Sequence, residues 1–339
     1  MEFTRFDHDQ ASDAEFDEVA RFLASMDAAD RPGWSSRSAT ALADFLKNRQ
    51  SFGYDVSLWL GSEASGGAER LTASCWLNLA LSPENRQTVL VEIRVRPDLR
   101  RRGIASDFLR ALTPMIRVAE RDHVIGSTTS HGPGELWGAS VGMKPTLRYV
   151  RQVLRLGDAD QSLWDRPVPD GYRFEDWTDR TPDRLVASYA VALQAMDDAV
   201  SGDLQWSQPR WTPERVRETE ERLAATGNAA RVVAAVDEAS GEVAGLTQIA
   251  VSATRPEVVE QLDTSVRREH RGRGLGLAMK AAQLRAIAER PGLERVKTDT
   301  ADLVHMAAIN RALGFQDESE DVYIEADLAE IEAALATDS

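Results

Sequence analysis

Two arginine- and glycine-rich segments, about half a chain apart, have the residue types of an anion-binding turn. Residues 100–105 and 271–276 both follow the pattern Arg-x-x-Gly-x-(Gly/Ala). An apolar run precedes each segment and a long amphipathic run follows it, which predicts a strand, a turn and a helix. The unpaired N–H groups of a first helical turn and the helix dipole both favour a negative charge there. Both segments are therefore predicted to bind phosphate.

An acidic residue lies at the corresponding place in the strand before each turn. Alignment on the arginines matches Glu92 with Asp263. Burial of a carboxylate inside an apolar strand is costly and raises its pKa, which makes each acid a candidate for proton transfer. The alternative for either residue is an ion pair with a neighbour such as Arg94, or exposure at a sheet edge.

Length, composition and charge limit the classes of protein that the chain can form. At 339 residues, two domains are expected. The net charge of −15 argues against nucleic acid as a partner. No apolar run approaches the ~18 residues of a membrane span, and the first residues lack the apolar core of a signal peptide. A cytoplasmic protein without a membrane partner is therefore expected.

The single cysteine and the five histidines indicate neither a disulfide nor a metal site. Cys75 has no second cysteine to pair with and is expected to be a small buried apolar residue. The histidines lack the spacing of metal ligands. No metal is expected.

The predicted elements occur in the same order in both halves of the chain. Each half reads as a strand, two helices, three strands, the arginine turn, a helix, a strand, a short helix and a final strand, which is a mixed α/β fold. The final strands are predicted at residues 147–154 and 322–326. A segment rich in glycine, aspartate and proline separates the halves. The expected organisation is a domain at 1–157, a linker at 158–170 and a second domain at 171–339.

With these features together, the chain resembles a tandem protein of the GNAT (Gcn5-related N-acetyltransferase) superfamily. The resemblance is carried by the two arginine turns, by Val95 and Pro97 before the first turn, and by the late ending Leu313-Gly314-Phe315. The double-domain organisation is similar to that of mycothiol synthase. The resemblance implies two tandem domains, each a mostly antiparallel sheet flanked by helices, with a splay after the fourth strand.

Acetyl-CoA is the cosubstrate that the resemblance implies. Backbone amides of the turn would hold its pyrophosphate, and the preceding strand would pair with its pantetheine arm. The residues expected to contact CoA are Val95, Arg100, Arg101, Arg102, Gly103, Ile104 and Ala105 in the first half, and Val266, Arg271, Gly272, Arg273, Gly274, Leu275, Gly276 and Asn310 in the second.

Acetyl transfer to an amine requires a base, because an alkylammonium with a pKa near ~10 is protonated at neutral pH. Asp263 and Glu92 are the candidate bases. In the superfamily a tyrosine protonates the leaving thiolate, and this position is Asn310 in the second half and Gly138 in the first. Neither residue can donate a proton in that way. Asn310 is expected to bind the CoA arm or to orient a water, Tyr323 is a substitute candidate, and the second half is predicted to be the catalytic one.

The resemblance thus implies an acyl-CoA-dependent N-acyltransferase that moves an acetyl group to a primary amine of a small molecule, by direct attack in a ternary complex. The resemblance implies an acceptor site around the loop at residues 197–211, whose acids and tryptophans could hold a cation. The alternative is a solvated loop whose tryptophans are packed down as anchors. A monomer acting as an internal pseudo-dimer is expected. The alternative is a CoA-binding pseudoenzyme, a sensor or scaffold, which the missing tyrosine favours. Aminoacyl transfer from charged tRNA is disfavoured by the acidic charge.

Overall fold

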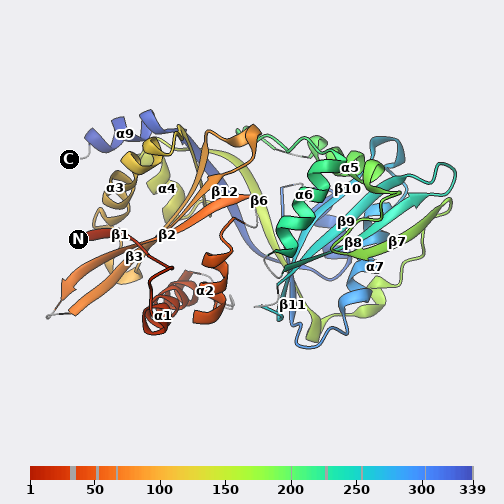
Figure 1. The fold of residues 1–339 in the computed structure, drawn as a ribbon, viewed down its shortest axis with the longest axis horizontal. Helices are drawn as coiled ribbons and strands as arrows, with labels where there is room; N and C mark the ends of the chain where they lie inside the picture. The colour runs from red at the N-terminus through yellow and green to blue at the C-terminus, as the bar shows by residue number, and fades with distance from the viewer. Residues whose placement is uncertain are drawn as a thin grey trace. The chain divides into compact units, whose positions relative to one another are not determined.

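The computed structural model describes residues 1–30, 36–50, 53–65, 68–199, 201–225, 228–252, 255–301 and 303–337. The chain divides into two compact units (Figure 1). Unit 1 comprises Met1–Leu147 and Val322–Ser339, and unit 2 comprises Arg148–Asp321. The mixed α/β architecture agrees with the sequence-based expectation. The division differs from the contiguous domains expected at 1–157 and 171–339.

Two long strands, β6 (Lys144–Arg155) and β12 (Gln316–Asp327), account for this difference, because each has residues in both units. The sequence predicts the last strand as the end of the second domain, but its final residues lie next to β5 (His123–Thr129) and pack into the core of unit 1. The end of β6 pairs instead with β11 (Arg295–Thr300) in unit 2, in antiparallel register. The two strands carry similar apolar patterns, so the pattern alone does not decide which unit each strand completes.

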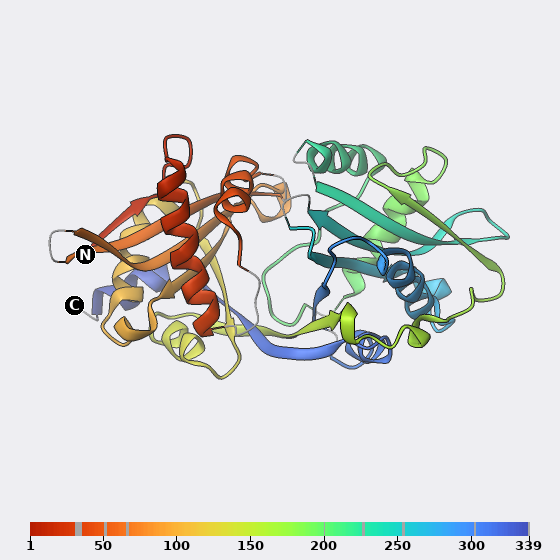
Figure 2. The same cartoon turned by 90° about the horizontal axis from the view of Figure 1, so that it is seen from below.

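Unit 1 is a mixed sheet in the order β1-β2-β3-β4-β5-β12-β6. Neighbours from β1 to β4 are antiparallel, and β4 and β5 are parallel. Figure 2 shows α1, in red, lying across the strands of this unit. Its further elements are β1 (Glu2–Arg5), α1 (Asp13–Asp30), α2 (Ala39–Lys47), β2 (Tyr54–Ser65), β3 (Ala68–Ala80), β4 (Thr88–Val95), α3 (Ile104–Val118), α4 (Pro133–Ser140) and α9 (Leu328–Thr337).

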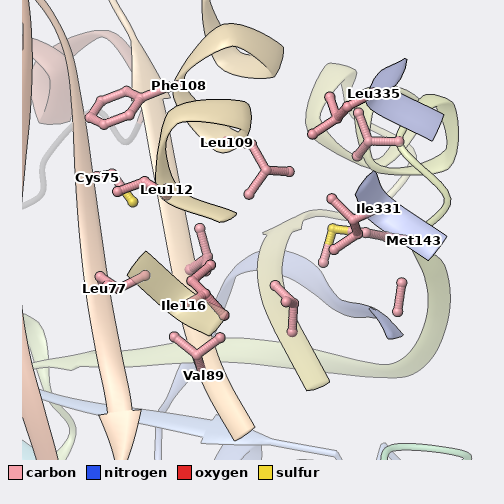
Figure 3. Packing of buried hydrophobic residues seen from close by; sticks show 14 of the residues in the cluster. Cys75, Leu77, Val89, Phe108, Leu109, Leu112, Ile116, Met143, Ile331 and Leu335 are labelled. Carbon is pink, nitrogen blue, oxygen red and sulfur yellow. The ribbon is translucent and has the colours of Figure 1, made fainter. Parts of the chain in front are cut away.

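The core of unit 1 forms between α3 and the sheet. Buried residues of α3 recur at three- and four-residue spacing, as Phe108, Leu112 and Ile116 do, so one side of the helix is apolar. This side meets Val89 of β4 and Cys75 of β3 (Figure 3). The C-terminal helix α9 closes the same core beside α3 (Figure 1). The faces of β4 and α3 that point into this core are therefore closely packed.

Unit 2 has the sheet order β12-β6-β11-β10-β9-β8-β7. One apolar cluster packs α5 and α6 on this sheet, and two other clusters pack α7 and the end of α8. Its further elements are β7 (Tyr172–Thr178), α5 (Val186–Gln194), α6 (Pro213–Ala224), β8 (Asn228–Asp237), β9 (Val243–Ser252), β10 (Val258–Val266), α7 (Leu275–Ile287) and α8 (Met306–Ala312). Among the residues that the structure describes in both units, no helix has the length and hydropathy needed to cross a membrane.

In both units the fourth and fifth strands separate after a short parallel contact. β4 pairs with β5 only from Thr88–His123 to Leu90–Ile125, although β4 continues to Val95. β10 likewise pairs with β11 only as far as Glu260. No further β4–β5 or β10–β11 pair forms beyond these points among the described residues, so the predicted splay is present in both units.

The two fourth strands differ by one residue. β3 and β4 pair in unbroken register. In unit 2 the register between β9 and β10 shifts, because Gln261 pairs with Ile249 and Thr264 pairs with Thr247. Two residues of β10 therefore face one residue of β9, which is a β-bulge. Asp263 is one of these two residues.

Candidate functional site

The turn after β10 opens with an arginine that braces the chain. Arg271 Nε donates to the backbone oxygen of Val266, 2.9 Å away, and its Nη2 donates to Asp198 Oδ2 at 2.7 Å. Gly272 and Gly274 both have φ of +75°, a conformation that side-chain-bearing residues rarely adopt. A Cβ at either glycine would meet no atom within 4 Å. The turn thus presents open backbone at the start of α7.

The turn after β4 has the same bracing contacts. Arg100 Nε donates to Val95 O at 2.9 Å, and Nη2 donates to Asp30 Oδ1 at 2.5 Å. Gly103 has φ of +78°, and a Cβ there would meet no atom within 4 Å. The position that is Gly272 in unit 2 is Arg101 here, with φ of +61°. This turn therefore holds a strained non-glycine residue where the other has glycine.

Both helices begin without a side-chain cap, since Gly103 and Gly274 occupy the cap positions of α3 and α7. Their first N–H groups remain available for an anion. Ile104 and Leu275 are buried and anchor the helices. The first arginines of both turns are already paired with aspartate, so the anion-binding groups of each turn are the backbone amides and the remaining, exposed arginines. These are Arg101 and Arg102 in unit 1 and Arg273 in unit 2.

Asp263 lies in the β10 bulge, beyond the last residue that pairs with β11. Its Oδ2 accepts a hydrogen bond from Gln248 Nε2 at 3.1 Å, and Gln248 Oε1 accepts one from the Tyr189 hydroxyl at 3.2 Å. No basic side chain pairs with this carboxylate in the part of the chain that the structure describes. A carboxylate without a cation, next to open strand backbone, can take a proton from a cationic ligand.

Burial raises the pKa of Asp263, and the hydrogen bond from Gln248 only partly opposes this effect. Burial also raises the pKa of Tyr189, with smaller contributions from the charges of Asp263 and Glu220. Tyr189 therefore stays protonated and donates its hydrogen bond permanently. A carboxyl group whose pKa is raised above its usual range is better suited to act as a general base.

Glu92 of unit 1 has different surroundings. It lies opposite Trp76 in the regular β3–β4 ladder. Two residues further along β4, Arg94 Nη1 donates to Asp27 Oδ1 at 2.6 Å. Burial opposes the charge on Arg94, but the hydrogen bond to Asp27 and the charges of Glu92, Asp27 and Asp30 outweigh it and raise the Arg94 pKa. The ion pairs of Arg94 are thus with Asp27 and Asp30, and the charge of Glu92 also favours the protonated guanidinium.

Asn310, at the tyrosine position, is buried on α8. Its Nδ2 donates to Gln152 Oε1 at 2.7 Å, and Gln152 Nε2 donates to Asp317 Oδ1 at 2.7 Å. Its Oδ1 is buried and has no hydrogen-bond partner in the described residues. A buried acceptor without a donor is costly, and an amide N–H of a ligand would satisfy it.

The corresponding position of unit 1, Gly138, is closed by other side chains. A Cβ there would lie 2.4 Å from Ile324 Cδ1. At Gly126, the first β5 residue beyond the paired region, a Cβ would meet Ile324 Cγ1 at 3.3 Å and the Val91 backbone oxygen at 3.4 Å. The strand β12 supplies Ile324, whose side chain leaves no room for a larger residue at Gly138. Tyr323 lies on the same strand and belongs to unit 1, not to the unit of Asn310.

The predicted acceptor segment 197–211 is described except for Val200. Its Asp198 is engaged by Arg268 at 2.8 Å as well as by Arg271. Trp211 is half-buried against the apolar cluster of α5 and α6, and its backbone N–H donates to Gln194 Oε1 at 2.7 Å. Asp198 and Trp211 therefore fix parts of this segment on the turn and on α5.

Sequence reasoning missed several residues around Asp263 and α7. Gln248 and Tyr189 become neighbours of the acid only through pairing of β9 with β10 and packing of α5. Lys280 is buried at 2% exposure inside α7. The sequence feature that could have revealed this burial is that Lys280 is a single charged residue between the uncharged runs Leu275–Met279 and Ala281–Ala282.

The remaining polar candidates are structural. Cys75 is fully buried, and burial followed by the charge of Glu92 raises its thiol pKa, which disfavours a nucleophile. His270 Nδ1 lies 2.8 Å from the Tyr172 hydroxyl. The described residues contain no group of three or more His, Cys, Asp or Glu placed to hold a metal ion.

Comparisons with known proteins agree with this geometry. Residues 196–315 match the model of the Acetyltransferase (GNAT) family. A tandem GNAT protein from the clavulanic acid biosynthesis pathway is 24% identical, with a TM-score of 0.74 over 96% of this chain and 98% of its own. The chain has the tandem GNAT fold. A GCN5-related N-acetyltransferase from Sphaerobacter thermophilus is similar at 17% identity, with a TM-score of 0.66 and 96% of both chains covered. No curated protein sequence matches the chain.

The segment that matches the family model lies entirely within unit 2. The matched segment begins just before Asp198 and ends at Phe315, so it includes β10, the second turn, α7 and α8. The first turn lies outside the match. The half of the chain with the bulge, the glycine-rich turn and Asn310 is therefore the half that the acetyltransferase model matches.

Proposed function

We propose that the protein is an acyl-CoA-dependent N-acyltransferase and that unit 2 carries the reaction. The observation that carries this proposal is the β10 bulge. It brings the half-buried carboxyl group of Asp263, which has no basic partner among the described residues, to the splay. The strand that carries Asp263 ends just before the turn into α7, and the N-terminus of α7 has no side-chain cap. The GNAT fold and the family match over 196–315 support acyl transfer at the level of reaction class.

The residues of unit 2 fit acyl-CoA as the cosubstrate. The N–H groups of the turn at Gly272–Gly276 would hold the pyrophosphate, and the free backbone of β10 beyond Glu260 would pair with the amide-containing arm. Asn310 Oδ1 offers the buried acceptor that an arm N–H would satisfy. When bound, acyl-CoA supplies an acyl group activated as a thioester.

Asp263 is proposed to take the proton from the acceptor ammonium, by itself or through one water. Its charge attracts a cationic amine, and its raised pKa lets it hold the proton once the amine is neutral. In the overall transfer an N–C bond forms and the C–S bond breaks. The ammonium loses two protons, of which one balances the leaving thiol and the other passes through Asp263 to solvent. We propose a small-molecule primary amine as the acceptor and direct attack in a ternary complex.

Unit 1 is proposed to be a structural partner without turnover. Ile324 packs against Gly138 and leaves no room for a side chain at the tyrosine position, and the regular β3–β4 ladder gives Glu92 no bulge like that of Asp263. The closed tyrosine position and the regular strand both argue against catalysis in this unit.

Calorimetric titration with acetyl-CoA, followed by a thiol-release assay on a panel of small amines, tests the proposal. We expect one equivalent of acetyl-CoA per chain and thiol release that depends on the amine. Binding without release on any amine would favour the CoA-sensing alternative. No binding at all would overturn the acyltransferase proposal.

A further inference from the structure

Gln248 is a polar side chain on β9 that lies between the proposed base and a buried tyrosine. In the β10 bulge, two residues of β10 face Gln248, and Asp263 is one of them. Gln248 Nε2 donates to Asp263 Oδ2 at 3.1 Å, and Gln248 Oε1 accepts from the Tyr189 hydroxyl at 3.2 Å. The three side chains therefore form a chain of two hydrogen bonds that ends at the carboxylate.

The chemistry of these three groups fixes the orientation of the Gln248 amide. An ionised carboxylate only accepts hydrogen bonds, so Gln248 Nε2 must face Asp263. Gln248 Oε1 then faces Tyr189, and the hydroxyl must be the donor. With the amide turned over, its oxygen would lie against the carboxylate and repel it. The Tyr189 hydroxyl therefore determines which end of the amide Asp263 meets.

Further contacts hold Tyr189 and Gln248 in place. The Tyr189 ring packs edge-on against Trp177, with the ring centroids 5.5 Å apart, in the apolar cluster of α5 and α6. The backbone oxygen of Gln248 accepts from Gln261 Nε2 at 2.7 Å, and Gln261 is itself buried. Gln248 is thus anchored through its backbone and through its side-chain oxygen. The donor that Asp263 meets is fixed before any ligand binds.

The Gln248 hydrogen bond favours the ionised form of Asp263. Burial raises the Asp263 pKa, and this hydrogen bond lowers it. Oδ1 of Asp263 has no hydrogen-bond partner in the described part of the chain, so it remains available to an acceptor ammonium. The charge of Glu220 on α6 acts on Tyr189, and Arg217 Nη1 pairs with that carboxylate at 2.7 Å. Gln248 is therefore the group that counteracts the effect of burial on Asp263.

Unit 1 does not repeat this arrangement. Trp76 lies opposite Glu92 in the β3–β4 ladder, and its ring packs edge-on against Phe45, with the centroids 5.7 Å apart. An indole donates one hydrogen bond and accepts none. Trp76 therefore cannot link a hydroxyl to a carboxylate as the Gln248 amide does.

Resting on the acyltransferase function proposed above, we propose that Tyr189 and Gln248 are positioning residues for the base. Tyr189 orients the Gln248 amide, and Gln248 holds Asp263 in its ionised form with one oxygen left for the acceptor ammonium. No bond is formed or broken at either positioning residue. Their effect on the reaction passes through Asp263 alone.

Tyr189→Phe removes the hydroxyl and keeps the ring, and Tyr172→Phe is its matched control. Tyr172 is buried to the same degree as Tyr189, in the separate apolar cluster that packs against α7. Its hydroxyl lies 2.8 Å from His270 Nδ1 and has no other hydrogen-bond partner among the described residues. The two variants therefore remove the same atom from equally buried sites of unit 2, and only the first site is linked to Asp263.

The first readout is the titration of the Asp263 carboxyl group, followed by carbon-13 NMR of protein labelled at its aspartates. Asp263→Asn identifies the signal. Because the Gln248 hydrogen bond lowers the Asp263 pKa, its loss in Tyr189→Phe should raise that pKa by about one unit. We expect Tyr172→Phe to titrate as the wild type does. Equal Asp263 pKa values in Tyr189→Phe and wild type would overturn the proposal.

The second readout is a double-mutant cycle in kcat, with acetyl-CoA and the fastest amine of the panel both saturating. At pH 7 we expect kcat to be about 10-fold lower in Gln248→Leu and about fivefold lower in Tyr189→Phe. If Tyr189 acts only through Gln248, the double variant is no slower than Gln248→Leu. Losses that multiply in the double variant would overturn the relay. Gln248→Met takes the place of Gln248→Leu if that variant is not folded.

A merely structural role and a failed function give different results. Loss of positioning leaves the KM for acetyl-CoA within about twofold of wild type, whereas a raised KM with an unchanged Asp263 pKa would overturn the positioning role. Wild-type protein that neither binds acetyl-CoA nor releases thiol would overturn the acyltransferase function and this inference together. Wild-type turnover, with Tyr189→Phe matching Tyr172→Phe in both readouts, would overturn only the positioning role.

Discussion

β4 of unit 1 and β10 of unit 2 lead into turns with the same bracing contacts, yet they differ in the residues just before the turn. Each turn arginine bonds its strand's last oxygen and an aspartate from an earlier segment. β4 has 8 residues and runs in regular register, whereas β10 has 9 and bulges at Asp263. The comparison teaches that the braced turn is present in both units, while the proton transfer that we propose depends on the strand.

The largest expected difference between the two strands is catalytic. Asp263→Asn should lower kcat/KM for amine acylation by about 10²–10⁴-fold, because an amide cannot accept the proton. Glu92→Gln, at the matching place of β4, should change it less than twofold. Steady-state rates of both variants with acetyl-CoA check this. Similar losses in the two variants would mean that the strands are functionally equivalent.

The next largest difference is expected between the two turns, in their affinity for acetyl-CoA. Gly274→Glu places a side chain at a φ of +75° and a negative charge in the anion site. We expect acetyl-CoA to bind at least about 100-fold more weakly, a change of about 2.8 kcal/mol. Gly103→Glu makes the same change at φ +78° in unit 1 and is expected to leave affinity unchanged. Calorimetry distinguishes them, and a loss of affinity in the Gly103 variant would place a CoA site in unit 1.

The half-buried carboxyl group of Asp263 on β10 should also affect how the stability of the protein depends on pH. Because burial raises the Asp263 pKa, the folded state binds the proton more tightly than the unfolded state, and stability declines as pH rises through the folded pKa. Asp263→Asn removes this penalty. We expect a melting temperature about 2–4 °C higher at pH 7.5, with the difference vanishing toward pH ~4. A constant difference across pH would contradict the assigned burial effect.

The smallest effect should come from the strained residue of the first turn. Arg101→Gly relieves a φ of +61° that glycine tolerates, at some cost in unfolded-chain entropy. The net gain should be about 0.5–1 kcal/mol in free energy of unfolding, measured by denaturant titration. Gly272→Arg, the reverse change in unit 2, should destabilise by a similar amount and weaken acetyl-CoA binding. Stabilisation by the reverse change would show that the strain is absent.

Local features of both strand–turn–helix units could be predicted from the sequence, because they depend on neighbouring residues. The arginine spacing, the glycines of positive φ and the amphipathic α3 are properties of short segments. Alignment on the arginines paired Glu92 with Asp263 without revealing that the strands differ by one residue. The bulge arises from pairing with β9, and a distant strand determines that register.

Long-range placement could not be predicted for similar reasons. Strands 147–154 and 322–326 were interchangeable by pattern, and core packing places Val322 and Ile324 in unit 1. The buried Lys280 lies near the ring of Phe315, which is 35 residues away in sequence. A single lysine in an otherwise apolar helix segment is ambiguous until its neighbours are known.

Because β6 and β12 each have residues in both units, the two repeats of the gene depend on each other. A gene cut between its two repeats would encode two proteins, each lacking the strand end that its core needs. We expect neither half to be soluble alone, and the pair to be recovered when both are made together. Such mutual dependence would preserve the first repeat through evolution even if only the second carried out the reaction, since deleting the first would also unfold the second.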